Sequence, residues 1–238
     1  MSTNIPSAIL PYKRKAWKPI VEESDGSILA SKFSGIPYLN RTEEYPRCQN
    51  CDKPLQFFIQ LNLGELPESI RDDFGNGLLQ MFYCISEEPL CEVECEAFFP
   101  FAESVIIRII QPEDEAFSSR ILPPENLFPP KLIIGWQEVE DYPNSEEGES
   151  LDIELEDSEW EFLYEKNYPQ VGDKLAGYPA WVQGIEYPNC PLCGERMQLL
   201  FQLDSEDNLP YMFGDVGCGH ITQCKRHKEQ LAFGWACG

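Results

Sequence analysis

Ten cysteines and two histidines are the residues of this 238-residue sequence best suited to chemistry, and eight of these residues follow a repeated spacing. In the second half, Cys190-x2-Cys193 is followed, after thirty residues, by Cys224-x2-His227. Two such pairs of donors, each in a tight turn and separated by strands, are typical of a zinc ribbon. The spacing therefore predicts that these four residues hold a zinc ion.

The first half carries a looser version of the same pattern. Cys48-x2-Cys51 is followed by Cys84-x6-Cys91, so the second pair of donors is more widely spaced. Cys95 is an alternative to Cys91, and the shorter separation from Cys84 favours Cys91. We predict a second zinc ion held by Cys48, Cys51, Cys84 and Cys91.

Two other interpretations of the cysteines fit the sequence less well than zinc binding. Buried free thiols are common core residues, but two Cys-x2-Cys pairs at equivalent positions of a repeat would then be a coincidence. A redox Cys-x-x-Cys opens a helix, whereas Pro54 and the apolar residues after it indicate a strand. Cys218, His220 and Cys237 are left as packing residues, with a Cys218–Cys237 disulfide or alternative ligation as second options.

Chemistry at the predicted metal sites is not expected. An ion with four protein ligands has no open position for water, so both zinc ions would be structural. The sequence has no GxSxG, P-loop or GxGxxG motif, and its carboxylates occur in runs typical of solvated surface. No catalytic residue and no cofactor other than two zinc ions is predicted.

The elements that position the ligands come from an internal duplication. Residues 32–61 and 174–203 align at a separation of 142, and residues 73–84 and 213–224 align at 140. Apolar runs predict strands at 55–63, 78–84, 104–110, 131–139, 197–203 and 231–237, an edge strand at 17–22, and a short helix from Asp157 or Ser158. We expect a mainly β fold (α+β with few short helices) of duplicated, mostly antiparallel sheets, with two zinc-ribbon-like pairs of knuckles.

The duplication also suggests how the chain is divided. We expect an N-terminal arm over 1–31, a first repeat over 32–140, an acidic connecting segment over 141–173 and a second repeat over 174–238. The two repeats are expected to form one compact pseudo-symmetric unit.

The charge of the chain favours a basic partner. The 41 acids and 18 bases give a net charge of −23, and thirteen of the acids lie between residues 138 and 165. Such a surface repels polyanions, so we expect neither nucleic acid nor an anionic membrane as a partner, and a basic protein is favoured. Solubility is the alternative reason for the charge. Lys13, Arg14, Lys15 and Lys18 form a basic cluster that could dock a partner or be solvated.

The expected location is cytoplasmic. No apolar stretch reaches the roughly 18 residues that a membrane span needs, and the first residues lack the pattern of a signal peptide. In a reducing compartment, cysteines bind metal more readily than they form disulfides.

The cysteine-containing runs also carry a resemblance. YPRCQNCDKPLQFFIQLNL, GLLQMFYC and YPNCPLCGERMQLLFQLDSEDNLPYMFGDVGCG resemble the YwqG-like family of uncharacterised proteins over almost the whole chain. This resemblance implies a duplicated, mostly antiparallel β fold and brings no established activity.

A shorter pattern is similar to the programmed cell death protein 2 family, in which a Gly-x-Pro turn precedes a Cys-x2-Cys, an apolar PLxFxxQ strand and a strand ending FxC. The matching residues are Gly35, Pro37, Cys48, Cys51, Pro54, Leu55, Phe57, Gln60, Phe82, Cys84 and Cys91. This resemblance implies a chaperone for a basic ribosomal protein.

Together these patterns predict a non-enzymatic, zinc-stabilised protein-binding module, such as a chaperone or adaptor for a basic protein. The alternative is a small-ligand-binding protein or an enzyme with a site between the repeats, near Asp204, Glu206, Asp207 and Asp215.

Overall fold

The computed structural model describes residues 5–113 and 128–238, and they form one ten-stranded antiparallel sheet. Its strand order is β10-β9-β8-β7-β1-β6-β2-β3-β4-β5. The strands are β1 (Arg14–Glu22), β2 (Lys32–Phe33), β3 (Gln56–Asn62), β4 (Leu78–Tyr83), β5 (Val105–Ile110), β6 (Lys131–Asp141), β7 (Lys174–Ala176), β8 (Gln198–Asp204), β9 (Cys218–Gln223) and β10 (Leu231–Ala236). The predicted mainly β, mostly antiparallel fold is confirmed.

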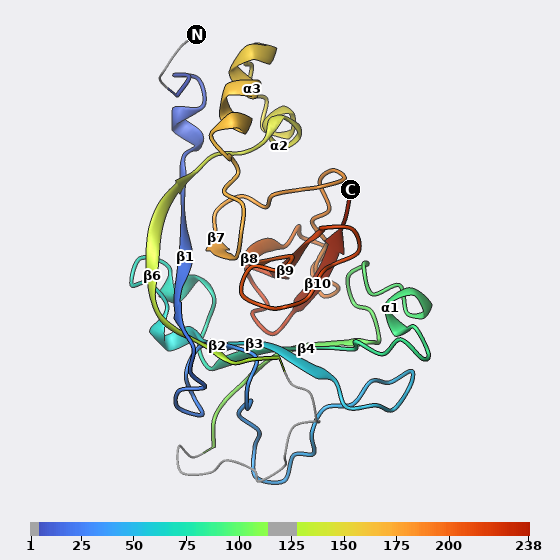
Figure 1. Cartoon of the computed structure of the whole chain (residues 1–238). Coiled ribbons are helices and arrows are strands. Elements are labelled where there is room, and N and C mark those ends of the chain that lie inside the picture. Colours follow the sequence, from blue (N-terminus) through green and yellow to red (C-terminus); the bar gives the residue numbers. More distant parts are fainter. Residues whose placement is uncertain (1–4, 114–127) are drawn as a thin grey trace.

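The strand order shows that the two halves of the chain exchange their first strands. We call β1 to β5 the first half of the chain and β6 to β10 the second half. Despite this order along the chain, β1 pairs with β6 and β7, and β6 pairs with β1 and β2. Figure 1 shows β1 and β6 side by side, as a long ribbon that connects the two sets of strands. Each half therefore completes the sheet of the other.

The edge strand predicted at 17–22 differs from the observed β1, which begins at Arg14 and lies in the interior of the sheet. Only Ala16 and Trp17 pair with β7, whereas the whole strand pairs with β6. Pro19 and the exposed Ile20 and Glu22 lie beyond those two residues. One end of β1 thus has partners on both sides, and the other end has a partner on one side.

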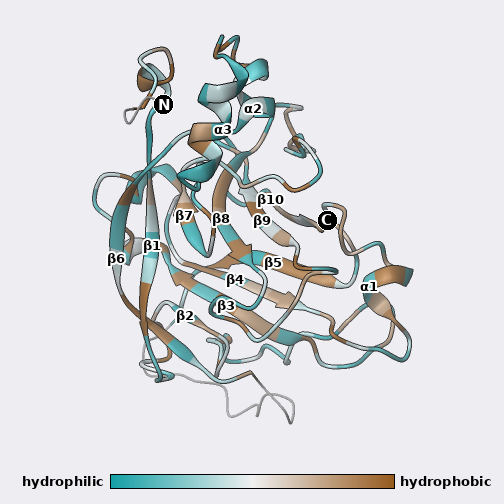
Figure 2. Ribbon diagram, turned by 45° about the horizontal axis from the view of Figure 1, so that its top comes forward, coloured by the Kyte–Doolittle hydropathy of each residue, from teal (hydrophilic) through white to brown (hydrophobic). Residues whose placement is uncertain are grey.

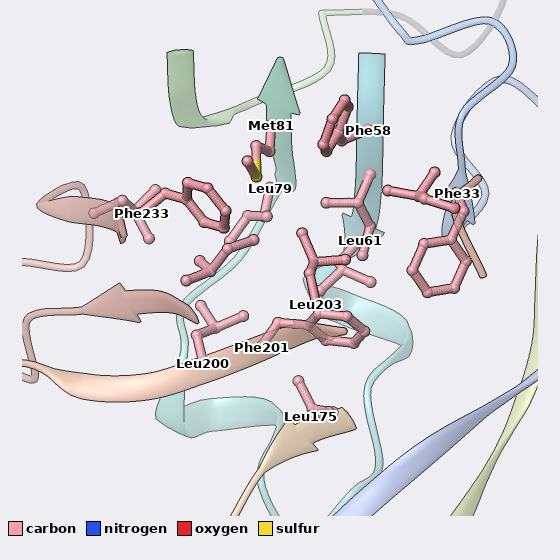
Figure 3. Packing of buried hydrophobic residues seen from close by; sticks show 14 of the residues in the cluster. Phe33, Phe58, Leu61, Leu79, Met81, Leu175, Leu200, Phe201, Leu203 and Phe233 are labelled. Carbon is pink, nitrogen blue, oxygen red and sulfur yellow. The ribbon is translucent and has the colours of Figure 1, made fainter. Parts of the chain in front are cut away.

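The main hydrophobic core lies between the two halves of the curled sheet. In Figure 3, Leu200, Phe201 and Leu203 of β8 face Leu61 of β3 and Leu79 of β4. The rings of Phe33 and Phe201, one from each half, are 6.0 Å apart. All residues of β4 and β9 are buried, as are nearly all of β3 and β8, so both faces of these strands are covered.

The two ends of the sheet approach each other. The backbone N–H of Trp235 in β10 donates to the carbonyl of Phe98, just before β5, at 3.1 Å. The sheet is therefore close to a closed barrel, an arrangement that leaves little exposed strand edge.

Three short α-helices accompany the sheet in the described residues: α1 (Cys91–Glu94), α2 (Ser145–Ser150) and α3 (Asp157–Glu165). The helix predicted from Asp157 is α3, and its first turn is closed by a capping box between Glu156 and Glu159. None of the described helices is long and apolar enough to cross a membrane.

Residues 142–168 form a small unit that we call the acidic knob. It packs around Tyr142, Ile153 and Leu163, together with Ile9 of the N-terminal segment. Figure 1 shows α2 and α3 near the N-terminus, away from β3 and β4. Figure 2 shows hydrophilic residues in α2 and α3 and hydrophobic residues along β3 and β4.

Buried glutamines hold the turn that precedes each knuckle. Gln60 accepts from the N–H of Tyr38 at 3.1 Å, and its equivalent Gln202 accepts from that of Ala180 at 2.8 Å. Each side-chain amide also donates to two carbonyls, Ile28 and Ala30 or Gln170 and Gly172. Every partner in one half is 142 residues from its counterpart, so the duplication extends to individual hydrogen bonds.

An ion pair with a buried lysine repeats in the same way; the aspartate is buried in the second half and partly exposed in the first. Lys32 Nζ lies 2.9 Å from Asp25 Oδ1, and Lys174 Nζ lies 2.9 Å from Asp141 Oδ2. The same carboxylate oxygens accept the N–H of Ile36 and Tyr178, which fixes the turn. Each aspartate ends or closely follows the first strand of its half, and the two are not 142 residues apart, so sequence alignment did not find them.

Candidate metal centres

The second group of predicted ligands converges to a point. The donor atoms of Cys190, Cys193, Cys224 and His227 all lie within 4.8 Å of one another. Cys190 Sγ is 3.6 Å from His227 Nδ1, and Cys193 Sγ is 3.7 Å from Cys224 Sγ. A tetrahedral zinc ion with sulfur ligands at about 2.3 Å would separate the sulfurs by about 3.8 Å. The four residues fit such an ion.

The first group converges in the same manner. Cys48 Sγ is 3.8 Å from Cys91 Sγ, and Cys51 Sγ is 3.7 Å from Cys84 Sγ. Cys95 follows the last residue of α1, and its N–H donates to the carbonyl of Cys91, so it lies one turn further along. The structure thus brings Cys91, and not Cys95, into the group of four.

Each Cys-x2-Cys pair sits in a knuckle that the backbone builds identically. The N–H of Cys48 donates to Lys53 O at 2.9 Å, and the N–H of Cys190 donates to Glu195 O at 2.9 Å. The turn requires a left-handed residue, supplied by Asp52 at a φ of 55° and by Gly194 at 72°. Two matched knuckles therefore aim two thiols each at the second pair of donors.

A hydrogen-bond donor lies near one sulfur of each group, but its effect on the thiol pKa differs between the groups. The N–H of His227 donates to Cys224 Sγ at 3.4 Å, and Asn50 Nδ2 donates to Cys91 Sγ at 3.4 Å. Burial opposes ionisation of Cys224, but the N–H groups of His227 and Arg226 outweigh it and lower its pKa to about 6. At Cys91 burial dominates and raises the pKa to about 11 despite Asn50.

The described cysteines are free thiols, with no disulfide among them. The Sγ separations of 3.7 and 3.8 Å within the groups are far longer than a disulfide bond of about 2.05 Å. With four protein donors, each group leaves no ligand position for water or substrate. What the geometry supports is a structural ion, which holds two knuckles together.

The residual cysteines and histidine pack against neighbours. His220 lies against the ring of Trp181 at 4.6 Å, and its Nε2 is 3.7 Å from Cys218 Sγ. Burial lowers the pKa of His220 to about 3, so the ring is neutral at pH 7. Cys218 lies opposite Ala236, one residue before Cys237, and no disulfide joins these cysteines.

Two of the four acids predicted near a ligand site accept hydrogen bonds from a neighbouring loop. Asp204 Oδ2 accepts the N–H of Gly172 at 2.8 Å, and Asp207 Oδ2 accepts that of Asp173 at 2.7 Å. Glu206 and Asp215 are exposed. None of these four acids lines the cleft beside Trp17 or the cleft beside Trp181.

Comparison with known proteins places the chain in a family. Residues 31–233 match the model of a domain of unknown function, DUF1963. The chain belongs to the DUF1963 family. Both groups of metal-ligand residues lie inside the DUF1963 match, whereas β1 precedes it.

A curated relative is similar to a short part of this DUF1963 chain. Over 46 residues the chain is 46% identical to the uncharacterized protein YpfL of Salmonella typhimurium (strain LT2). The match covers 19% of this chain and 11% of YpfL.

Proposed function

We propose that this DUF1963 chain is a non-enzymatic, zinc-stabilised binding protein whose acidic knob engages a basic segment of a partner protein, as a chaperone or adaptor does. The observation that carries the proposal is the acidic knob, where exposed carboxylates gather around an exposed aromatic ring. The family assignment brings no activity, so the proposal rests on the chain's own residues.

Zinc is the metal that suits the two groups. Thiolate and imidazole donors in a closed tetrahedral set favour Zn²⁺ over hard cations such as Ca²⁺ and Mg²⁺. The free thiols also fit a reducing compartment, which supports a cytoplasmic location.

The acidic knob carries a large excess of negative charge, with Lys166 as the one cation in its sequence. Its exposed carboxylates are Glu146, Glu149, Asp152, Glu154, Glu156, Asp157, Glu161 and Glu165. Tyr164 lies among them with 80% of its surface exposed. Carboxylates steer a basic partner, and an exposed aromatic ring offers a face to an Arg or Lys side chain.

The resemblance to the programmed cell death protein 2 family supports the same class of partner. It covers the first knuckle and the strands that follow it, from Gly35 to Cys91, and implies a basic client. The net charge of −23 is complementary to such a client.

Metal content tests the zinc part of the proposal. We expect two zinc ions per purified chain, and one in each of the variants Cys48→Ser and Cys190→Ser, because each removes a ligand from one group. Cys95→Ser is the matched control and keeps two ions. A wild-type chain that is folded and metal-free would refute structural zinc.

Binding of a synthetic Lys/Arg-rich peptide tests the acidic knob. We expect affinity to fall steeply as salt screens the charges. The triple variant Asp157→Asn, Glu161→Gln, Glu165→Gln should bind the peptide several-fold more weakly than wild type. Its control removes three exposed acids elsewhere, as Glu65→Gln, Glu68→Gln and Asp72→Asn. Equal losses in the two triple variants, or no binding at low salt, would contradict the assignment to the knob.

A further inference from the structure

A cleft of about 640 Å³ lies at the junction of the two halves. Its walls come from β1, from residues 69–74 of the first half, from β7 and β8 of the second half, and from Lys225 in the second knuckle. This volume lies within the range of small-molecule sites, about 300–1,000 Å³.

The charge balance of the cleft is the reverse of that of the chain. Four basic residues line it, namely Arg14, Lys15, Arg196 and Lys225, against two acids, Asp73 and Glu147. The whole chain has 41 acids and 18 bases. A cluster of cations in so acidic a protein is therefore a specific feature of this cleft.

One of the two lining acids is already neutralised. Glu147 is buried and accepts from Arg196 Nη2 at 2.8 Å, from Tyr187 Oη at 3.1 Å and from Trp181 Nε1 at 3.1 Å. This network also fixes the Arg196 guanidinium over the Tyr187 ring, 3.7 Å from its centroid. Glu147 and Arg196 thus cancel each other.

Two of the remaining cations have no carboxylate partner among the described residues. Arg14 lies over the Tyr178 ring at 3.8 Å and donates to Gly177 O at 3.4 Å, while Lys225 is exposed. Lys15, in contrast, pairs with Glu138 at 2.9 Å. Arg14 and Lys225 are therefore the charges available to a ligand.

The rest of the lining is largely apolar. Trp17, Ile70 and Phe74 contribute from the first half, and Leu151, Met197 and Leu199 from the second. Apolar walls lower the local dielectric and strengthen the attraction between a bound anion and the cations beside it.

We propose that this cleft binds a small organic anion, with its acidic group near Arg14 and Lys225 and its apolar body against Trp17, Ile70 and Phe74. The site differs in sign and place from the acidic cluster around Asp204. Glu147 and Leu151 of the acidic knob line the cleft, but the exposed acids of the knob do not.

The test uses two fluorescent probes with the same apolar type of body. One is anilinonaphthalene sulfonate, an anion, and the other is phenylnaphthylamine, its uncharged counterpart. We expect one anionic probe to bind per zinc-loaded chain. Arg14→Gln and Lys225→Gln should each weaken its binding about tenfold, or about 1.4 kcal/mol, and leave the uncharged probe unchanged.

Two further variants separate the cleft from net charge and from misfolding. Ser69→Asp adds an acid to the exposed rim of the cleft and should weaken the anion without removing any existing contact. Lys166→Gln removes the same charge from the residue that follows α3, outside the cleft, and should leave the binding of both probes unchanged. Circular dichroism and zinc content are measured on every variant, and only variants that match wild type are compared.

Three results would overturn the proposal. The first is the absence of saturable binding of the anionic probe. The second is equal affinity of the anionic probe for wild type, Lys225→Gln and Ser69→Asp. The third is a loss in Lys166→Gln as large as that in Lys225→Gln, which would mean that net charge alone attracts the probe.

Discussion

At the scale of single residues, this fold depends on buried polar groups that are fully paired. The ammonium of Lys174 and the carboxylate of Asp141 are both inaccessible to solvent, and Asp141 also accepts the N–H groups of Gln170 and Tyr178. A buried charge is tolerated only when it is paired and hydrogen-bonded. This pair joins β6, the first strand of the second half, to β7, and the N–H of Tyr178 attaches the turn after β7 to the same carboxylate.

Removing one partner of this pair should be costly. We expect Asp141→Asn to lower the free energy of unfolding by about 3–5 kcal/mol, because Lys174 would keep a buried, uncompensated charge. Urea unfolding followed by tryptophan fluorescence measures the change. Glu138→Gln, which breaks the exposed pair with Lys15, is the control and should change stability by no more than about 1 kcal/mol. Equal effects of the two substitutions would contradict the role of the buried pair.

The ionisation of Asp173 makes the stability of the fold depend on pH. Burial, and then the charge of Asp207, raises the pKa of Asp173 to about 8, whereas an unfolded aspartate titrates near 3.8. Because the folded pKa is the higher one, the stability that the protonated form contributes is complete below about pH 4 and is lost as the pH rises through about 8.

The variant Asp173→Asn removes this titration. Relative to the variant, wild type should lose stability between about pH 4 and about pH 8. The equivalent position in the first half is the neutral Ser31, whose hydroxyl accepts the N–H of Asn62 as Asp173 accepts that of Asp204. Unfolding measured in urea from pH 4 to 9 gives the comparison, and a constant difference across this range would contradict the assigned pKa.

At the scale of elements, the knuckles are the units that prepare the metal centres. Their shape depends on the left-handed residue that directly follows each Cys-x2-Cys, Asp52 or Gly194. No atom lies within 4 Å of a Cβ built on Gly194, so a substitution there tests backbone conformation alone.

Gly194→Val should therefore weaken the second centre without creating a clash. We expect a cost of about 1–2 kcal/mol from forcing a β-branched residue into the left-handed region. A chelator should remove zinc from this centre at a lower chelator concentration than in wild type. The first centre should keep its affinity for zinc. Gly194→Asn is the matched control, because asparagine tolerates this conformation. Equal chelator resistance of the two variants would show that the turn does not limit metal binding.

At the scale of the whole molecule, the exchange of β1 and β6 makes the two halves interdependent. The core between them contains residues of β3, β4, β8 and β9, and the cleft lined by Arg14 lies at the junction of the two halves. Neither half has a complete sheet or a complete core by itself.

A cavity on one side of this core should consequently weaken both halves. Phe201→Ala is expected to cost about 3–5 kcal/mol, since Phe201 is fully buried. Hydrogen exchange should speed up in β3 and β4 as well as in β8 and β9. Tyr164→Ala, at an exposed site, should change neither. Faster exchange confined to the second half would mean that the halves unfold separately.

The sequence by itself determined the repeat, most of the strands and the identity of the eight residues that converge in two groups. These features are local or periodic: two cysteines in one knuckle are close because they are close in the chain, and a strand shows its apolar residues in order. The helix α2 was missed because Ser145–Ser150 is acidic and short, and it is held by the Asn144 cap and by tertiary packing.

Only the tertiary structure decided the long-range pairings. The exchange of β1 and β6, the partners of Lys32 and Lys174, and the lining of one cleft by Arg14 and Lys225 all join residues that are far apart or that do not align between the repeats. Such contacts follow from the burial of the two halves of the sheet against each other, which no local pattern encodes. The basic cluster at residues 13–18 was visible in the sequence, but only the tertiary structure showed that Arg14 and Lys15 line a cleft.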